Sequence, residues 1–165
     1  MGKCVSVSGN PDDMSDSHTQ QMQLEEALRT IILPPGIQLR CWTEKDFPDI
    51  QRLSTLQGWP TPRNRPEEAL SAWQHSWPAL VVTEGERVIG FVRGMTDGEI
   101  TMYIAELLID PNHRGKGIGR LLMDACHALC PRTRLDLIST EEAIPFYKAT
   151  GFCYVGEGLR KSYWE

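Results

Sequence analysis

The sequence lacks the long apolar run that a membrane-spanning helix needs. No stretch reaches the ~18 apolar residues typical of such a helix. The start of the chain contains no apolar segment of the kind found in signal peptides. Internal repeats and low-complexity tracts are also absent. The 165 residues therefore predict one soluble domain, for which we expect a cytoplasmic location.

An excess of positive charge and paired cysteines are missing as well. The net charge of −5 argues against a general nucleic-acid-binding protein, which is usually strongly basic. The five cysteines form no CxxC pair. Cys126 and Cys130 flank His127, but no second pair of ligands follows at the spacing of a zinc site. We expect reduced thiols and no metal site.

The N-terminus carries a weak modification signal. "MGKCVS" matches the pattern for myristoylation at Gly2, with Cys4 available for palmitate. The pattern is short, and Met14 offers an alternative start, so we expect no lipid anchor. Residues 1–14 are polar and rich in turn-forming residues, which predicts a disordered leader.

Hydrophobic periodicity predicts an N-terminal extension followed by a mixed α/β domain. Residues 15–35 form the extension, an amphipathic helix with Leu24, Leu28 and Ile31 on one face, which packs on the fold or serves dimerisation. Alternation and turn signals predict strands at 37–42, at three positions within 79–110, at 133–138 (buried), at 152–156 and at 159–164. Helices are expected at 43–57, 66–77, 118–129 and 140–151, with a loop at 58–66. A mixed sheet follows, since only the strand–helix–strand unit around 118–129 requires a parallel crossover.

The octapeptide "HRGKGIGR" (113–120) stands between a predicted strand and a predicted helix. Main-chain N–H groups at the start of a helix favour bound phosphate. The nucleotide-binding P-loop pattern fails because Asp110 stands where its first glycine belongs. The dinucleotide pattern GxGxxG fits poorly, because the third glycine comes one residue early at Gly119.

Two stretches resemble the motifs of the GNAT superfamily of N-acetyltransferases. "AELLIDPNHRGKGIGRLLMDAC" is similar to the family's acetyl-CoA motif, and "AIPFYKATGF" (143–152) is similar to its second motif. The resemblance covers residues 37–160 and implies a mostly antiparallel sheet, splayed at the acetyl-CoA site and flanked by helices. It thereby implies an acetyltransferase domain at 36–165.

The resemblance also implies which residues bind acetyl-CoA. The backbone of Leu107 would face the thioester carbonyl, and that of Ile109 the pantetheine amide. Thr140 stands where many members have asparagine, which puts a side-chain contact there in doubt. The full predicted set is Leu107, Leu108, Ile109, Arg114, Gly115, Lys116, Gly117, Ile118, Gly119, Arg120 and Thr140.

Acetyl transfer from a thioester to an amine needs a neutral amine and a proton for the departing thiolate. Tyr147 matches the position where many members hold a general acid. Glu106 precedes the acetyl-binding backbone, where several members carry a carboxylate that anchors or deprotonates the amine. Glu99 and Tyr103 are weaker candidates for that base.

The acceptor amine is expected beneath the first two helices of the domain. The predicted substrate-binding residues are Trp59, Trp73, Tyr103 and Glu106, with Trp77, Arg63, Arg65 and His75 nearby. Aromatic walls suit an amine with an apolar or ring-shaped body, although Trp73 and Trp77 fit core packing equally well. We expect a monomer or homodimer that acetylates a small primary amine in a ternary complex. Protein or peptide acetylation and a non-catalytic acyl-CoA sensor are the alternatives.

Overall fold

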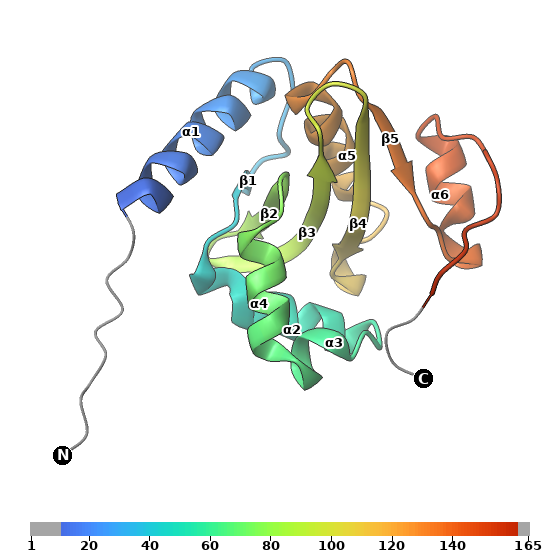
Figure 1. Ribbon diagram of the computed structural model, residues 1–165, viewed down its shortest axis with the longest axis horizontal. Helices are drawn as coiled ribbons and strands as arrows, with labels where there is room; N and C mark the ends of the chain where they lie inside the picture. Colours follow the sequence, from blue (N-terminus) through green and yellow to red (C-terminus); the bar gives the residue numbers. More distant parts are fainter. Residues whose placement is uncertain (1–10, 162–165) are drawn as a thin grey trace.

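The chain folds around a five-stranded mixed sheet in a computed structural model that describes residues 11–161, with side chains from His18 onward. The strands lie in sequence order as β1 (Ile37–Cys41), β2 (Ala79–Glu84), β3 (Arg87–Thr96), β4 (Thr101–Ile109) and β5 (Arg134–Leu137). Only β4 and β5 are parallel, because α5 (Ile118–Leu129) connects them. The predicted mixed, mostly antiparallel α/β fold is confirmed (Figure 1).

Helices cover both faces of the sheet and divide the core into two clusters. On one face, α5 and α1 (Pro11–Leu28) contribute Leu122 and Leu24, both fully buried. On the other, α2 (Phe47–Leu56) and α4 (Pro66–Gln74) contribute Leu53 and Trp73. The remaining elements are α3 (Thr61–Asn64), α6 (Ile144–Ala149) and three 3₁₀ turns, η1 (Glu44–Asp46), η2 (Pro111–His113) and η3 (Glu141–Ala143).

The N-terminal helix is shifted from its predicted position. Residues 11–14 belong to α1 rather than to a disordered leader, and residues 1–10 of the predicted leader lie outside the described residues. The helix ends at Leu28, before Ile31, which still packs against the core. The lipidation-like residues Gly2 and Cys4 lie outside the described residues.

The C-terminal part differs most from prediction. Residues 152–161, which include the first expected strand and part of the second, adopt no strand, and Tyr154, Val155 and Leu159 are largely exposed. A strand is stable only when its main chain pairs, and β5 is the last strand of the described sheet. As an edge strand, β5 is less buried than predicted, with Arg134 exposed and its other three residues half-buried.

Two smaller differences concern helices. The predicted loop at 58–66 contains the short helix α3, which has a proline in its first turn. The helix starting at Pro66 ends at Gln74 rather than continuing to residue 77. In the part of the chain that the structure describes, no helix is both long and apolar enough to cross a membrane.

Candidate active site

Strand β4 has two unlike edges near its C-terminal end. Its pairing with β3 runs on to Ile109, but its pairing with β5 stops at Ile104, opposite Leu137. Over residues 105–109, no described strand therefore covers the main chain on the β5 side. This opening is the predicted splay of the sheet.

The hydrogen-bond pattern decides which main-chain groups face the opening. Asp110 N–H donates to the Ile89 carbonyl of β3 (2.8 Å). Along an antiparallel strand, the main-chain N–H and C=O groups of successive residues point alternately toward the partner strand and away from it. Leu107 and Ile109 therefore direct their N–H and C=O groups toward the open edge. Arg114 Nε donates to the Ile109 carbonyl there (3.2 Å). Leu108 instead bonds to β3 and buries its side chain in the core, so its main chain does not face the opening.

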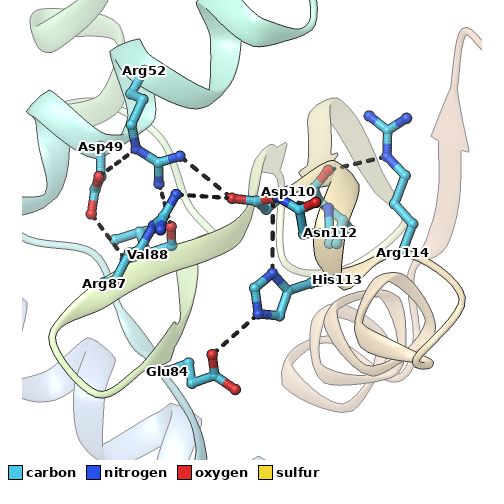
Figure 2. A network of polar contacts seen from close by, with 10 residues as sticks. Asp49, Arg52, Glu84, Arg87, Val88, Asp110, Asn112, His113 and Arg114 are labelled. Carbon is cyan, nitrogen blue, oxygen red and sulfur yellow. Dashed lines mark hydrogen bonds and ion pairs between the residues drawn. The ribbon is translucent and has the colours of Figure 1, made fainter.

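Asp110 fixes the turn that leaves β4. It is 1% exposed and accepts a bond from the Asn112 amide (3.0 Å), while Arg52 Nη1 and Arg87 Nη2 lie 3.4 and 3.5 Å from its Oδ2 (Figure 2). Burial by itself raises the pKa of Asp110. The Asn112 amide and the two guanidinium groups outweigh that effect, so its pKa lies below the ordinary value.

A wider polar network supports Asp110 and was not foreseen from sequence. Arg52 also donates to Asp49 (2.8 Å) and to the Val88 carbonyl (2.8 Å), which ties α2 to β3. His113 lies 3.2 Å from Glu84 on β2 (Figure 2). The only signal in the sequence was a carboxylate directly after an apolar strand. The network gives the glycine-rich loop a rigid starting point.

The three glycines of the loop do different things. Gly115 and Gly117 adopt φ of 75° and 82°, a left-handed conformation that other residues rarely take. Gly119 lies in the first turn of α5, where a β-carbon would come 3.0 Å from the Phe146 ring. Its small size therefore permits packing between α5 and α6.

The start of α5 is an exposed group of hydrogen-bond donors. The first N–H groups of a helix have no carbonyl within the helix to bind. Here they belong to Ile118, Gly119 and Arg120, and only the Ile118 side chain is buried. Lys116 and Arg120 are exposed beside them, with Arg120 3.6 Å from Asp124. Arg114 turns back instead, donating to Gln57 (2.6 Å).

Tyr147 lies on α6, next to the Phe146 that packs on Gly119. Its ring contacts Phe146 and Phe152 at centroid distances of 5.0 and 5.5 Å. Burial raises the pKa of the Tyr147 phenol, which keeps it protonated at neutral pH. Thr140 precedes η3, and its side chain makes no capping hydrogen bond there.

A β-bulge directs Glu106. Arg93 pairs with Glu106, but the next residue of β3, Gly94, pairs with Ile104, which leaves Ala105 as an extra residue. Such a bulge re-aims the side chains beside it. Ile104 therefore packs with α5, whereas Glu106 lies on the opposite face, 3.0 Å from Arg93 Nη2. Arg93 also donates to Ser76 (3.1 Å), which bonds to the Ala72 carbonyl of α4 (2.6 Å). Sequence reasoning missed Arg93, a charge within an apolar strand.

Glu106 and Trp73 line a common cavity of about 210 Å³, which we call the acceptor recess. Its other lining residues are Thr61, Pro62, Arg65, Glu68, Ala69, Ala72 and Arg93. Trp73 is also a core residue, 1% exposed and in ring contact with Trp42 and Phe91. The structure thus brings together two of the predicted substrate-binding residues.

The other candidates lie elsewhere. Trp59 packs against the core cluster of Trp73 without lining the recess. Trp77 packs on the opposite face of the sheet and lines a groove beside α1. Tyr103 precedes the bulge, opposite Met95 of β3, and does not line the recess. Glu99 lies in the turn before β4 and pairs with Arg132 (2.6 Å).

Comparisons with known proteins agree with this geometry. The model of the acetyltransferase (GNAT) family matches residues 38–152. The histone acetyltransferase TAP1 of Glycine max is 29% identical over 131 residues, which cover 72% of this chain and 57% of that protein. The chain therefore spans little more than half of that relative's length.

Two solved structures share the fold. A putative acetyltransferase from Deinococcus radiodurans R1 superposes with a TM-score of 0.64, at 24% identity over 78% of this chain and 90% of its own. AAC(6')-Iy, solved with the bisubstrate analog CoA-S-monomethyl-acetylneamine, gives a TM-score of 0.61 at 14% identity. The match covers 76% of this chain and 97% of that one. Because the family model covers most of the chain and the fold agrees, this protein belongs to the GNAT acetyltransferase family.

Proposed function

We propose that this protein transfers the acetyl group of acetyl-CoA to the primary amine of a small molecule, by direct attack in a ternary complex. The observation that carries the proposal is the open edge of β4, which leads through an anchored turn into the N-terminus of α5. The family uses acetyl-CoA, whose pantetheine arm offers amides to a strand edge and whose pyrophosphate is an anion.

The residues present fit that ligand. Leu107 and Ile109 supply main-chain groups at the open edge, although Arg114 already bonds to the Ile109 carbonyl. The N–H groups around Gly117 and the side chains of Lys116 and Arg120 supply donors and positive charge for phosphate. Acetyl-CoA, when bound, supplies an activated thioester.

Three groups of the chain then share the chemistry. Glu106 lies at the wall of the acceptor recess, where it can hold the attacking amine and take its proton. The neighbouring Leu107 N–H is a fixed donor for the oxygen on which negative charge develops as the nitrogen–carbon bond forms. Tyr147 carries a proton at neutral pH, which it can give to sulfur as the carbon–sulfur bond breaks.

Protein amines are the second candidate for the acceptor. The relative TAP1 is named a histone acetyltransferase, and at 29% identity that name supports a polypeptide acceptor as an alternative. A non-catalytic acyl-CoA sensor is the third candidate. The position of the Glu106 carboxylate at the wall of the acceptor recess argues against it, because a sensor needs no such group.

A thiol-release assay with acetyl-CoA separates these functions. The full chain is incubated with small primary amines and, in parallel, with peptides that carry free lysines or free N-termini. We expect thiol release with at least one small amine and product masses raised by one acetyl group. Release with peptides alone would favour the second candidate. Acetyl-CoA binding without turnover on any acceptor would overturn the proposal in favour of a sensor.

A further inference from the structure

The acceptor recess limits the size of what enters it. At about 210 Å³ it has the volume of roughly seven water molecules, so it admits a group of fewer than about ten non-hydrogen atoms. Its walls between α3 and α4 are apolar, formed by Pro62, Ala69, Ala72 and Trp73. A short aliphatic chain fits these walls.

The charges of the recess are balanced. Glu106 pairs with Arg93 (3.0 Å), and Glu68 pairs with Arg65 on the same helix turn. Two acids and two bases therefore cancel, and the recess offers no excess of negative charge to a polycation. This balance favours an acceptor with a single ammonium group over a polyamine.

One of these ion pairs has unused hydrogen-bonding capacity. Glu106 Oε2 and Arg93 Nε are both buried and have no partner among the described residues. Leaving such atoms unpaired costs free energy, so their pairing by a ligand would strengthen binding. One is an acceptor and the other a donor. A complementary ligand carries an N–H group and an oxygen close together.

From these observations, and resting on the proposed function, we propose that the recess binds the head group of a small monoamine whose neighbouring carbon bears a hydroxyl or carbonyl oxygen. The ammonium or amine N–H donates to Glu106 Oε2, and the oxygen accepts from Arg93 Nε as the pair turns toward the ligand. Arg93 is thereby a specificity-determining residue, and it also positions Glu106 through Nη2.

Two amines of the same shape test this proposal. Alaninol and sec-butylamine both carry a primary amine, and they differ by a hydroxyl in place of a methyl group. We expect kcat/KM for alaninol to exceed that for sec-butylamine by about tenfold to a hundredfold, the range given by one hydrogen bond to a charged group. Calorimetric titration of each amine into the protein saturated with CoA should show the same preference in Kd.

Variants of Arg93 test whether this residue causes the preference for alaninol over sec-butylamine. Arg93→Met should bring the two amines within about twofold of each other, and Arg93→Lys should restore part of the difference. Arg29→Met removes an exposed Arg–Glu pair near the end of α1 and should leave the preference unchanged. Circular dichroism checks that each variant is folded. If Arg93→Met fails to fold, the comparison of amines in the unaltered chain still decides the proposal.

The outcomes separate this inference from the proposed function. Equal kcat/KM for alaninol and sec-butylamine would overturn the inference and leave the acetyltransferase function standing. Turnover of spermidine but of neither test amine would do the same. Turnover of peptides alone would overturn the inference and would favour the second candidate function. No turnover with any amine would overturn the proposed function and the inference with it.

Discussion

The two sides of β4 near its C-terminal end are built in opposite ways. On the β5 side, main-chain groups of Leu107 and Ile109 face an open edge, and side chains matter little. On the β3 side the main chain pairs with β3 from Glu106 to Ile109, and the ion pair of Arg93 and Glu106 lines the acceptor recess. Under the proposed function, β4 offers its backbone to acetyl-CoA and its side chains to the acceptor amine. Side-chain substitutions within this part of β4 should therefore impair acetylation of the acceptor far more than binding of acetyl-CoA.

Glu106→Gln is expected to have the largest effect. It keeps the shape of the side chain but removes its capacity to take a proton, so kcat/KM should fall about a hundredfold to ten-thousandfold. The Kd for acetyl-CoA, measured by calorimetry, should change less than about threefold, because the open edge is made of main chain. Glu99→Gln serves as the control and should keep full activity, since Glu99 lies in the turn before β4. Full activity of Glu106→Gln would show that the Glu106 carboxylate does not act on the acceptor amine.

Tyr147→Phe should lower kcat by about tenfold to a hundredfold, with the Kd for acetyl-CoA nearly unchanged. Because burial raises the pKa of Tyr147, its acidic form persists as the pH rises through the ordinary value of 10. In the unaltered chain, loss of this proton should therefore cause no fall in kcat between pH 7 and about pH 10, while deprotonation of the acceptor amine raises the rate. A pH–rate profile measures this. A large loss of affinity with normal turnover would argue against the role as an acid.

Gly117→Val should weaken acetyl-CoA binding by about tenfold, because a β-branched residue resists the left-handed conformation that Gly117 adopts at the start of α5. Gly36→Val introduces the same strain at φ 76°, between α1 and β1. It should reduce stability without changing the Kd. Equal effects of the two variants on the Kd would show that strain alone, rather than position, explains the loss.

Asp110→Asn should have the smallest effect, a loss of about 1 kcal/mol in the free energy of unfolding, because Arg52 and Arg87 lose a charged partner. The pKa of Asp110 is lowered from its ordinary value of 3.8. Its charge therefore stabilises the fold above that pH, and this contribution disappears as the pH falls through the lowered pKa. Urea unfolding at pH 7 and pH 3 measures it. If the free energies of unfolding of the unaltered chain and of Asp110→Asn differed more at pH 3 than at pH 7, the result would contradict this account.

How far the sequence predicts the site depends on the distance over which each signal acts. The sequence predicts acetyl-CoA binding at Gly115 and Gly117, and the structure adds their left-handed backbone, a feature that is local to the turn. Gly119 was assigned to acetyl-CoA with them, yet its size is explained by Phe146, which lies 27 residues further along the chain. Arg93 escaped notice because its significance depends on a partner from another strand.

The sequence by itself determined the order of the five strands of the sheet and of the longer helices, the glycine-rich turn and the resemblance to the family, since periodicity and turn chemistry act over a few residues. The tertiary structure alone decided the register between β3 and β4. The bulge at Ala105 turns Glu106 toward Arg93 and the recess. It also decided that residues 152–161 form no strand, because a strand exists only where another strand supplies its hydrogen bonds. Pairing between distant segments is a property of the folded chain.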